Sequence, residues 1–310
     1  MWVVWVASAV GIFLLLVVVH DLIQRKHAIL KNFPVIGHFR YLLEAIGPEL
    51  RQYIVTSNDE ELPFNRDQRR WVYASSKKQD NYFGFGTDSD LEQSSNYLII
   101  KHSAFPIPSP TPDDPDYDPY YTIPVAKIMG GYRNRRRAFR PPSIVNVSAM
   151  SFGSLSGNAI HALNAGSCLA GCLHNTGEGG ISPHHLQGGD LIWQIGTGYF
   201  GCRDEQGRFD LDRLVETTQK HSSVRAIELK LSQGAKPGLG GILPSSKITP
   251  EISAIRGIPM GQDCISPSAH TAFSDADSLL DFVEQIAEAT GLPVGIKSAV
   301  GEMDLWHDLA

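Results

Sequence analysis

A strand-like run that carries a lysine near its end is the feature of this sequence best suited to chemistry. Ile227–Leu231 is mostly apolar, Lys230 lies near its end, and a glycine-rich turn follows as far as Pro244. A lysine at the end of a buried strand can stabilise negative charge that develops on a bound ligand, and glycine lets backbone approach that ligand closely. The turn is therefore predicted to have no room for large side chains and to border a cofactor site.

The composition favours a folded protein with a small-molecule partner. The chain has 310 residues, of which 42% are hydrophobic and 19% charged, which allows one large domain or two smaller ones. Its formal net charge of -6 provides no basic field for a nucleic-acid backbone. Nucleic-acid binding is therefore not expected.

The cysteines and histidines do not predict a metal site. None of the four cysteines forms a C-x-x-C pair, so neither a zinc knuckle nor a disulfide framework is indicated. Cys168 and Cys172 are four residues apart in an apolar helical pattern, and we expect them to be buried thiols. His184 and His185 have no third ligand at suitable spacing, and we expect them to form an exposed loop pair.

The N-terminal segment is predicted to be a membrane helix. Trp2 to Val19 is uncharged and apolar, and at about 1.5 Å per residue it nearly spans a hydrocarbon core of roughly 30 Å. A signal peptide is the alternative, but it would need a basic residue before the apolar core and a small-residue cleavage site after it. Arg25 and Lys26 follow the run, so residues 1–27 are expected to be a retained single-pass anchor with the bulk of the chain in the cytoplasm.

Residues 28–142 are expected to form an irregular arm or linker. The proline-rich stretch at 106–115 is typical of an extended, solvated segment. Residues 62–78 mix aromatic with basic side chains, and two interpretations are open. The segment could contact anionic lipid headgroups, or it could be a solvated face packed on the main domain through Trp71 and Tyr73.

From residue 143 onward, strand-like and helix-like segments alternate. Strands are expected at 144–147, 191–195, 224–231, 263–266 and 293–298. Helices are expected from Ser156 to about Ala170, over 210–221, from Thr249 or Ser253, and over 275–290. Such alternation predicts an α/β fold with parallel strands and right-handed crossovers, closed either as an eight-fold barrel or as an open doubly wound sheet.

Motifs at the expected strand ends favour the barrel. Seven stretches carry them, in chain order: Ser148–Ser156, Asn175–Gly180, Trp193–Gly201, Gln233–Gly238, Ile248–Glu251, Ile255–Pro259 and Val294–Lys297. They resemble the FMN-binding synthase domain of glutamate synthase, and more closely the membrane-anchored members of the FMN-binding glutamate synthase family, which Phe83–Thr87 also resembles. A TIM barrel takes about 250 residues, so 143–310 is expected to form an incomplete TIM (β/α)8 barrel.

The resemblance also implies roles for individual residues. It implies FMN as cofactor, contacted by Ala149, Met150, Ser151, Gln194, Lys230 and Lys297. Of the two lysines, Lys230 is preferred as the group that faces the N1 and O2 edge of the flavin. Gly177, Lys236 and Arg256 match positions near the substrate, and Glu178 and Lys230 match the catalytic positions, with Glu178 polarising the substrate or handling its proton.

The implied reaction is the formation of glutamate from 2-oxoglutarate and ammonia, by hydride transfer from the flavin to an imine. Ile242 stands where the family has a glutamine that contacts 2-oxoglutarate, so another amino or hydroxy acid is an alternative substrate. An electron-donor protein and an iron-sulfur cluster are compatible with the complete protein, but the cluster's cysteines are not in this chain. A non-catalytic membrane-bound fragment is the remaining alternative.

Overall fold

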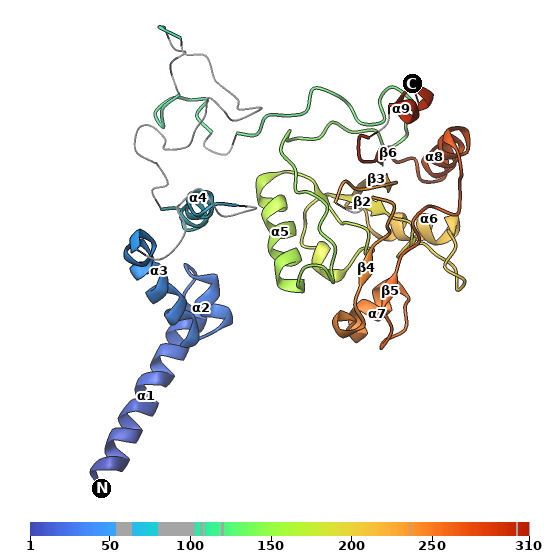
Figure 1. The fold of residues 1–310 in the computed structure, drawn as a ribbon. Coiled ribbons are helices and arrows are strands. Elements are labelled where there is room, and N and C mark those ends of the chain that lie inside the picture. Colours follow the sequence, from blue (N-terminus) through green and yellow to red (C-terminus); the bar gives the residue numbers. More distant parts are fainter. Residues whose placement is uncertain are drawn as a thin grey trace. The chain divides into compact units, whose positions relative to one another are not determined.

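The computed structural model describes residues 1–53, 64–79, 103–105, 108, 110–118, 121–235, 237–301 and 303–309. These residues belong to two compact units, Met1–Ile107 and Pro108–Ala310 (Figure 1). The 83–87 motif and Lys236 lie outside the described residues.

The described part of the first unit contains four helices. Helix α1 (Trp2–Ile23) is followed by α2 (Ala28–Asn32), α3 (Ile36–Tyr53) and α4 (Arg66–Ser76). The apolar window of α1 has no buried residue and is long enough to cross a membrane, although a signal sequence near an N-terminus has the same properties. The expectation of an irregular arm from residue 28 is wrong for α2, α3 and α4.

A buried carboxylate fixes the turn that joins these helices. Asp21, near the end of α1, accepts a hydrogen bond of 3.0 Å from the backbone N–H of Val35, and its Oδ1 lies 2.9 Å from His38 Nε2. Val35 has a φ of 66°, which is rare for a β-branched residue. The carboxylate therefore holds the strained entry to α3 against the end of α1.

The second unit contains a parallel sheet of four strands. Its strands are β1 (His174–Asn175), β2 (Leu191–Ile195), β3 (Val224–Lys230) and β6 (Val294–Lys297), in the spatial order β1-β2-β3-β6. Val147 extends the β1 edge through a single parallel bridge to His174. The mixed α/β class is confirmed, and closure of the sheet into a barrel stays a prediction.

A separate antiparallel pair corrects one predicted strand. The 263–266 segment contains β5 (Cys264–Ile265), but β5 pairs with β4 (Ile242–Leu243) and does not join the parallel sheet. The position beside β3 is taken by β6. Strand β1, whose polar residues His174 and Asn175 gave no strand pattern, is an additional strand beside β2.

The predicted helices form at their predicted caps. They are α5 (Gly157–Ala170), α6 (Leu211–Lys220), α7 (Pro250–Arg256) and α8 (Ala276–Thr290). A further helix that was not predicted is α9 (Asp304–Leu309), and 3-10 turns form at Pro183–His185 and Ser245–Lys247. Ser156, Asp210, Thr249 and Asp275 each accept a hydrogen bond from the backbone N–H three residues on. Such caps satisfy amide groups that a helix leaves unpaired at its start.

The main core lies between the sheet and one pair of helices. Helices α6 and α8 contact each other (Figure 1). Their apolar residues pack with Trp193, Ile227 and Leu229 of the sheet. The expectation of two buried thiols is wrong, since Cys168 is exposed and Cys172 is half-buried. Gly171, with a φ of 62°, ends α5 between them, so the two thiols do not share a helix face.

Candidate functional site

The parallel strands bring polar side chains together at their carboxyl ends. Gln194 on β2 pairs in register with Glu228 on β3, and Lys230 at the end of β3 pairs with Lys297 at the end of β6. In parallel α/β folds, ligand sites lie at this edge of the sheet. The register therefore places two lysines, an amide and a carboxylate at the edge where a ligand is expected.

A cavity of about 280 Å³ opens at this edge. This is close to the lower end of the range for small-molecule pockets, about 300–1,000 Å³. Of the predicted site residues, its lining contains Ala149, Ser151, Gly177, Glu178, Gln194, Lys230, Arg256 and Lys297. Met150 is not in the lining, and its carbonyl oxygen lies 3.0 Å from His185 Nε2.

Lys230 and Glu178 form an ion pair inside the cavity. The ammonium of Lys230 donates to Glu178 Oε1 at 3.0 Å and to Gln233 Oε1 at 2.5 Å. The two charged side chains are 12% and 23% exposed, respectively. Because the pair is largely shielded from water, its charges act more strongly on a bound ligand than a surface pair would.

Glycines make room for the carboxylate of Glu178. A Cβ at Gly196 would lie 2.6 Å from Glu178 Oε2, and one at Gly241 would lie 3.1 Å from Oε1. The prediction of a crowded turn after Lys230 is confirmed at Gly240, where a Cβ would overlap the carbonyl oxygen of Ser266. It is wrong at Gly234, where nothing lies within 4 Å.

Gln194 is held by a neighbour that the sequence reasoning missed. Glu228 Oε1 accepts hydrogen bonds from the Gln194 amide at 2.5 Å and from the Asn175 amide at 2.8 Å. The signal for Glu228 was a carboxylate in an otherwise apolar strand, two residues before Lys230 and therefore on the same face.

Arg256 brings a second cation to the cavity from the end of α7. It is buried, its Nη2 donates to the carbonyl oxygen of Phe152 at 3.0 Å, and its guanidinium carbon lies 5.1 Å from the centre of the Phe200 ring. Burial lowers the pKa of Arg256. Its Nε is buried with no hydrogen-bond partner among the described residues.

A buried tyrosine anchors the end of β3. The hydroxyl of Tyr199 accepts from the backbone N–H groups of Thr271 and Ala272, at 3.1 and 3.2 Å, and lies 3.1 Å from His270 Nδ1. His270 Nε2 lies 2.9 Å from the carbonyl oxygen of Lys230. The sequence reasoning missed this connection because its members are far apart in the chain.

The expectation of an exposed histidine pair is wrong for His185. This side chain is buried, with Nδ1 2.8 Å from Ser182 Oγ, whereas His184 is partly exposed and lies 3.0 Å from Glu251. Burial lowers the pKa of His185 and of His270, and it lowers the pKa of the neighbouring His174 to about 4. The fold therefore holds these imidazoles neutral near pH 7.

We expect the second unit to lose stability as the pH falls from about 6.5 toward 4. In that window the unfolded chain protonates His174, whose ordinary pKa is about 6.5, while the folded state keeps it neutral. Stability therefore rises with pH across the window, and His174 alone accounts for about 2 kcal/mol between pH 7.5 and pH 5. Urea unfolding of the detergent-purified chain, followed by circular dichroism at both values, measures the loss. The same loss in His174→Gln would exclude this imidazole as its source.

Comparison with known proteins identifies a protein family that the chain resembles. A family model described as a conserved region in glutamate synthase matches residues 132–305. The chain is 37% identical to the glutamate synthase large subunit-like protein YerD of Bacillus subtilis, over 92% of this chain and 59% of that relative. It is 39% and 38% identical to proteins named archaeal-type glutamate synthase (NADPH) of Thermotoga maritima and archaeal glutamate synthase (NADPH) of Methanocaldococcus jannaschii, over 50% of this chain and 28% of each relative.

Proposed function

The chain belongs to the glutamate synthase family, and from that premise we propose that it carries the flavin- and substrate-contacting part of an FMN-dependent oxidoreductase. The proposed reaction forms glutamate from 2-oxoglutarate and ammonia. The chain spans less than two thirds of the length of the relatives it matches. The observation that carries the proposal is the Lys230–Glu178 ion pair in a cavity at the carboxyl ends of parallel strands.

The residues that line the cavity fit a flavin ring in their chemistry. Ala149, Ser151 and Gly177 are small, and a Cβ at Gly177 would lie 2.7 Å from the backbone nitrogen of Ser151, so this wall is closely packed backbone. Lys230 and Lys297 place two cations on neighbouring strands, which suits the negative charge that a reduced flavin carries at one edge. When bound, FMN would supply the hydride chemistry.

The polar residues take distinct roles in this proposal. Lys230 would stabilise negative charge at the cofactor, and Gln194, oriented by Glu228, would hydrogen-bond it. Arg256 would bind a substrate carboxylate through its guanidinium group, and Lys236, at the next family position, would do the same. Glu178 would take up or release a proton at the substrate nitrogen through its carboxylate.

A second candidate is an FMN oxidoreductase that acts on another amino or hydroxy acid. Ile242 lines the cavity and offers no hydrogen bond to a distal carboxylate of 2-oxoglutarate. On this hypothesis, Ile242→Gln should shift the preference of the flavin-loaded protein toward 2-oxoglutarate in a panel of keto acids. An unchanged preference would count against Ile242 as the reason.

We also propose that α1 is a single-pass anchor that keeps the bulk of the chain in the cytoplasm. The apolar length of α1 and the basic residues Arg25 and Lys26 that follow it support this orientation. Protease treatment of sealed inner-membrane vesicles and of spheroplasts tests it. Digestion of the second unit from the cytoplasmic side alone is expected, and a processed, freely soluble chain would mean that α1 is a cleaved signal.

The experiment that tests the function is a measurement of flavin content. The detergent-purified chain is analysed with and without added FMN, in parallel with the same chain joined to the part of YerD that it does not match. Stoichiometric FMN on either protein supports the proposal, and turnover of 2-oxoglutarate with ammonia then tests the substrate. Absence of flavin from both proteins would favour the non-catalytic membrane-bound fragment.

A further inference from the structure

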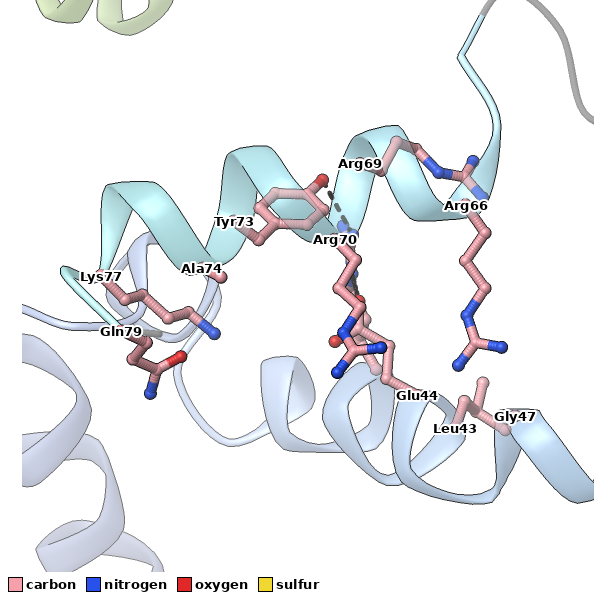
Figure 2. A pocket seen from close by; sticks show the side chains of 11 residues that line it. Leu43, Glu44, Gly47, Arg66, Arg69, Arg70, Tyr73, Ala74, Lys77 and Gln79 are labelled. Atoms are coloured by element: carbon pink, nitrogen blue, oxygen red, sulfur yellow. Dashed lines mark hydrogen bonds and ion pairs between the residues drawn. The ribbon is translucent and has the colours of Figure 1, made fainter. Parts of the chain in front are cut away.

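A basic pocket lies between α3 and α4 in the first unit (Figure 2). It has a volume of about 680 Å³, and among the described residues its charged lining consists of Arg40, Arg66, Arg69, Arg70 and Lys77 and one carboxylate, Glu44. Cations therefore outnumber carboxylates among the described lining residues. Such a concentration of cations around one cavity favours binding of an anion.

The basic residues of α4 are spaced so that they lie on the side of the helix that lines the pocket. Arg66 and Arg70 on α4 and Lys77 at its C-cap recur at intervals of four and seven residues, so they lie on one side of the helix. Figure 2 shows the side chains of Arg66 and Arg70 extending from α4 toward α3. Arg70 has no hydrogen-bond or ion-pair partner within the part of the chain that the structure describes. Its guanidinium group is therefore available to a ligand.

Polar contacts hold the two walls of the pocket together. Arg40 Nη2 donates to the hydroxyl of Tyr73 at 3.2 Å, and Arg40 Nε donates to Glu44 at 3.1 Å. The ammonium of Lys77 lies 5.4 Å from the centre of the Tyr41 ring. Tyr73 thus contacts α3, and the pocket exists before a ligand arrives.

A stripe of exposed apolar residues on α3 lies beside the pocket and indicates what kind of surface the pocket borders. The exposed apolar residues of this stripe are Ile36, Phe39, Leu42, Ile46 and Leu50. At about 100° per residue they share one side of α3, and Arg40, Glu44 and Gly47 of the pocket lie on the adjoining side. Exposed apolar residues beside basic ones are typical of a helix that lies in a membrane interface.

The connection to α1 places this stripe near the membrane. Helix α2 contacts both α1 and α3, and Asp21 ties the start of α3 to the end of the apolar helix. If α1 spans the membrane, α3 therefore begins at its surface. Anionic phospholipids at that surface present phosphate groups, which guanidinium forks bind in a bidentate manner.

We propose that this basic pocket binds the phosphate group of an anionic phospholipid. The inference goes beyond the proposed flavin chemistry and rests on the proposed anchor only for the source of the phosphate. Free phosphate ions share the same chemistry, and the experiment below distinguishes the two sources. No flavin is needed, so the outcome is independent of the enzymatic proposal.

The test measures lipid retained by the full chain. The chain is purified in mixed micelles that contain phosphatidylglycerol and phosphatidylcholine in equal amounts, and mass spectrometry quantifies the lipid that remains bound. We expect preferential retention of phosphatidylglycerol, reduced about fivefold in Arg70→Gln and further in Arg66→Gln/Arg70→Gln. Arg70→Lys, which keeps the charge without the fork, should retain an intermediate amount. Circular dichroism checks that each variant folds.

Lys31→Gln is the matched control, because Lys31 is an exposed cation on α2 outside the pocket. It should retain as much phosphatidylglycerol as the unchanged chain. Equal retention of the two lipids, or an equal loss in Lys31→Gln and Arg70→Gln, would overturn the pocket as the binding site. Displacement of the lipid by an equal concentration of inorganic phosphate would overturn the lipid as the source.

Discussion

Lys230→Ala should weaken FMN binding by roughly 30- to 150-fold. The substitution removes an ammonium that lines the proposed flavin cavity and leaves Glu178, which is 23% exposed, without its ion-pair partner. Loss of a hydrogen bond that involves a charged group costs about 2–3 kcal/mol, which corresponds to that change in Kd. Titration of the purified chain with FMN, followed by quenching of flavin fluorescence, measures the effect on whichever protein binds flavin in the content assay.

Two further lysines sharpen this test. Lys247 is exposed and outside the cavity lining, so Lys247→Ala should bind FMN as the unchanged chain does. Lys297→Ala removes the neighbouring cation and should have a smaller effect than Lys230→Ala. A larger effect at Lys297 would reverse the assignment of the two lysines, and no effect at either would argue against a flavin at this edge of the sheet.

Gly177→Ala should destabilise the second unit by about 2–5 kcal/mol. Gly177 has a φ of 66°, which costs about 1–2 kcal/mol for a residue with a Cβ. The new methyl group would also lie 2.7 Å from the backbone nitrogen of Ser151 and 2.8 Å from its Oγ, and overpacking typically costs about 1–3 kcal/mol more. Urea unfolding of the purified chain measures the change in the free energy of unfolding.

Gly234→Ala is the matched control for this substitution. Nothing lies within 4 Å of a Cβ at Gly234, and its φ is not in the left-handed region. Its unfolding free energy should change by no more than about 0.5 kcal/mol. Comparable stability of Gly177→Ala and Gly234→Ala would mean that the loop around Ser151 shifts freely, and the close backbone wall of the cavity would then be an incorrect description.

Elements with strong local signals were predictable from the sequence. Helix α8 is flanked by Asp275 and Gly291, the capping residues that predict its two ends, because caps act within a few residues of the helix end. The 263–266 segment was correctly seen as extended but placed in the wrong sheet, because alternation along one strand does not encode its partner. Strand β1 was missed because its two residues are polar and show no apolar strand pattern, although neighbouring segments bury both of them.

The candidate site was predictable where a residue follows a strand. Lys230 and Lys297 come at strand ends, and parallel pairing then sets them side by side. Glu228 orients Gln194 and Gln233 orients Lys230 through side-chain hydrogen bonds. Such contacts depend on side-chain geometry, which the spacing of residues along the sequence does not reveal. Helix α3 was missed because residues 28–142 were read as one irregular arm, and Pro48, a residue that usually interrupts a helix, lies inside it.

The hydrogen bonds of the Tyr199 hydroxyl determine how far the site is ordered before a ligand binds. Through His270 it links the main chain at Lys230 to the segment just before α8. These hydrogen bonds fix the end of β3, so the backbone of Lys230 is already ordered in the folded chain before a ligand binds. The entropic cost of ordering the backbone at Lys230 is therefore met during folding. An anion that binds the ammonium loses little affinity to ordering this part of the site.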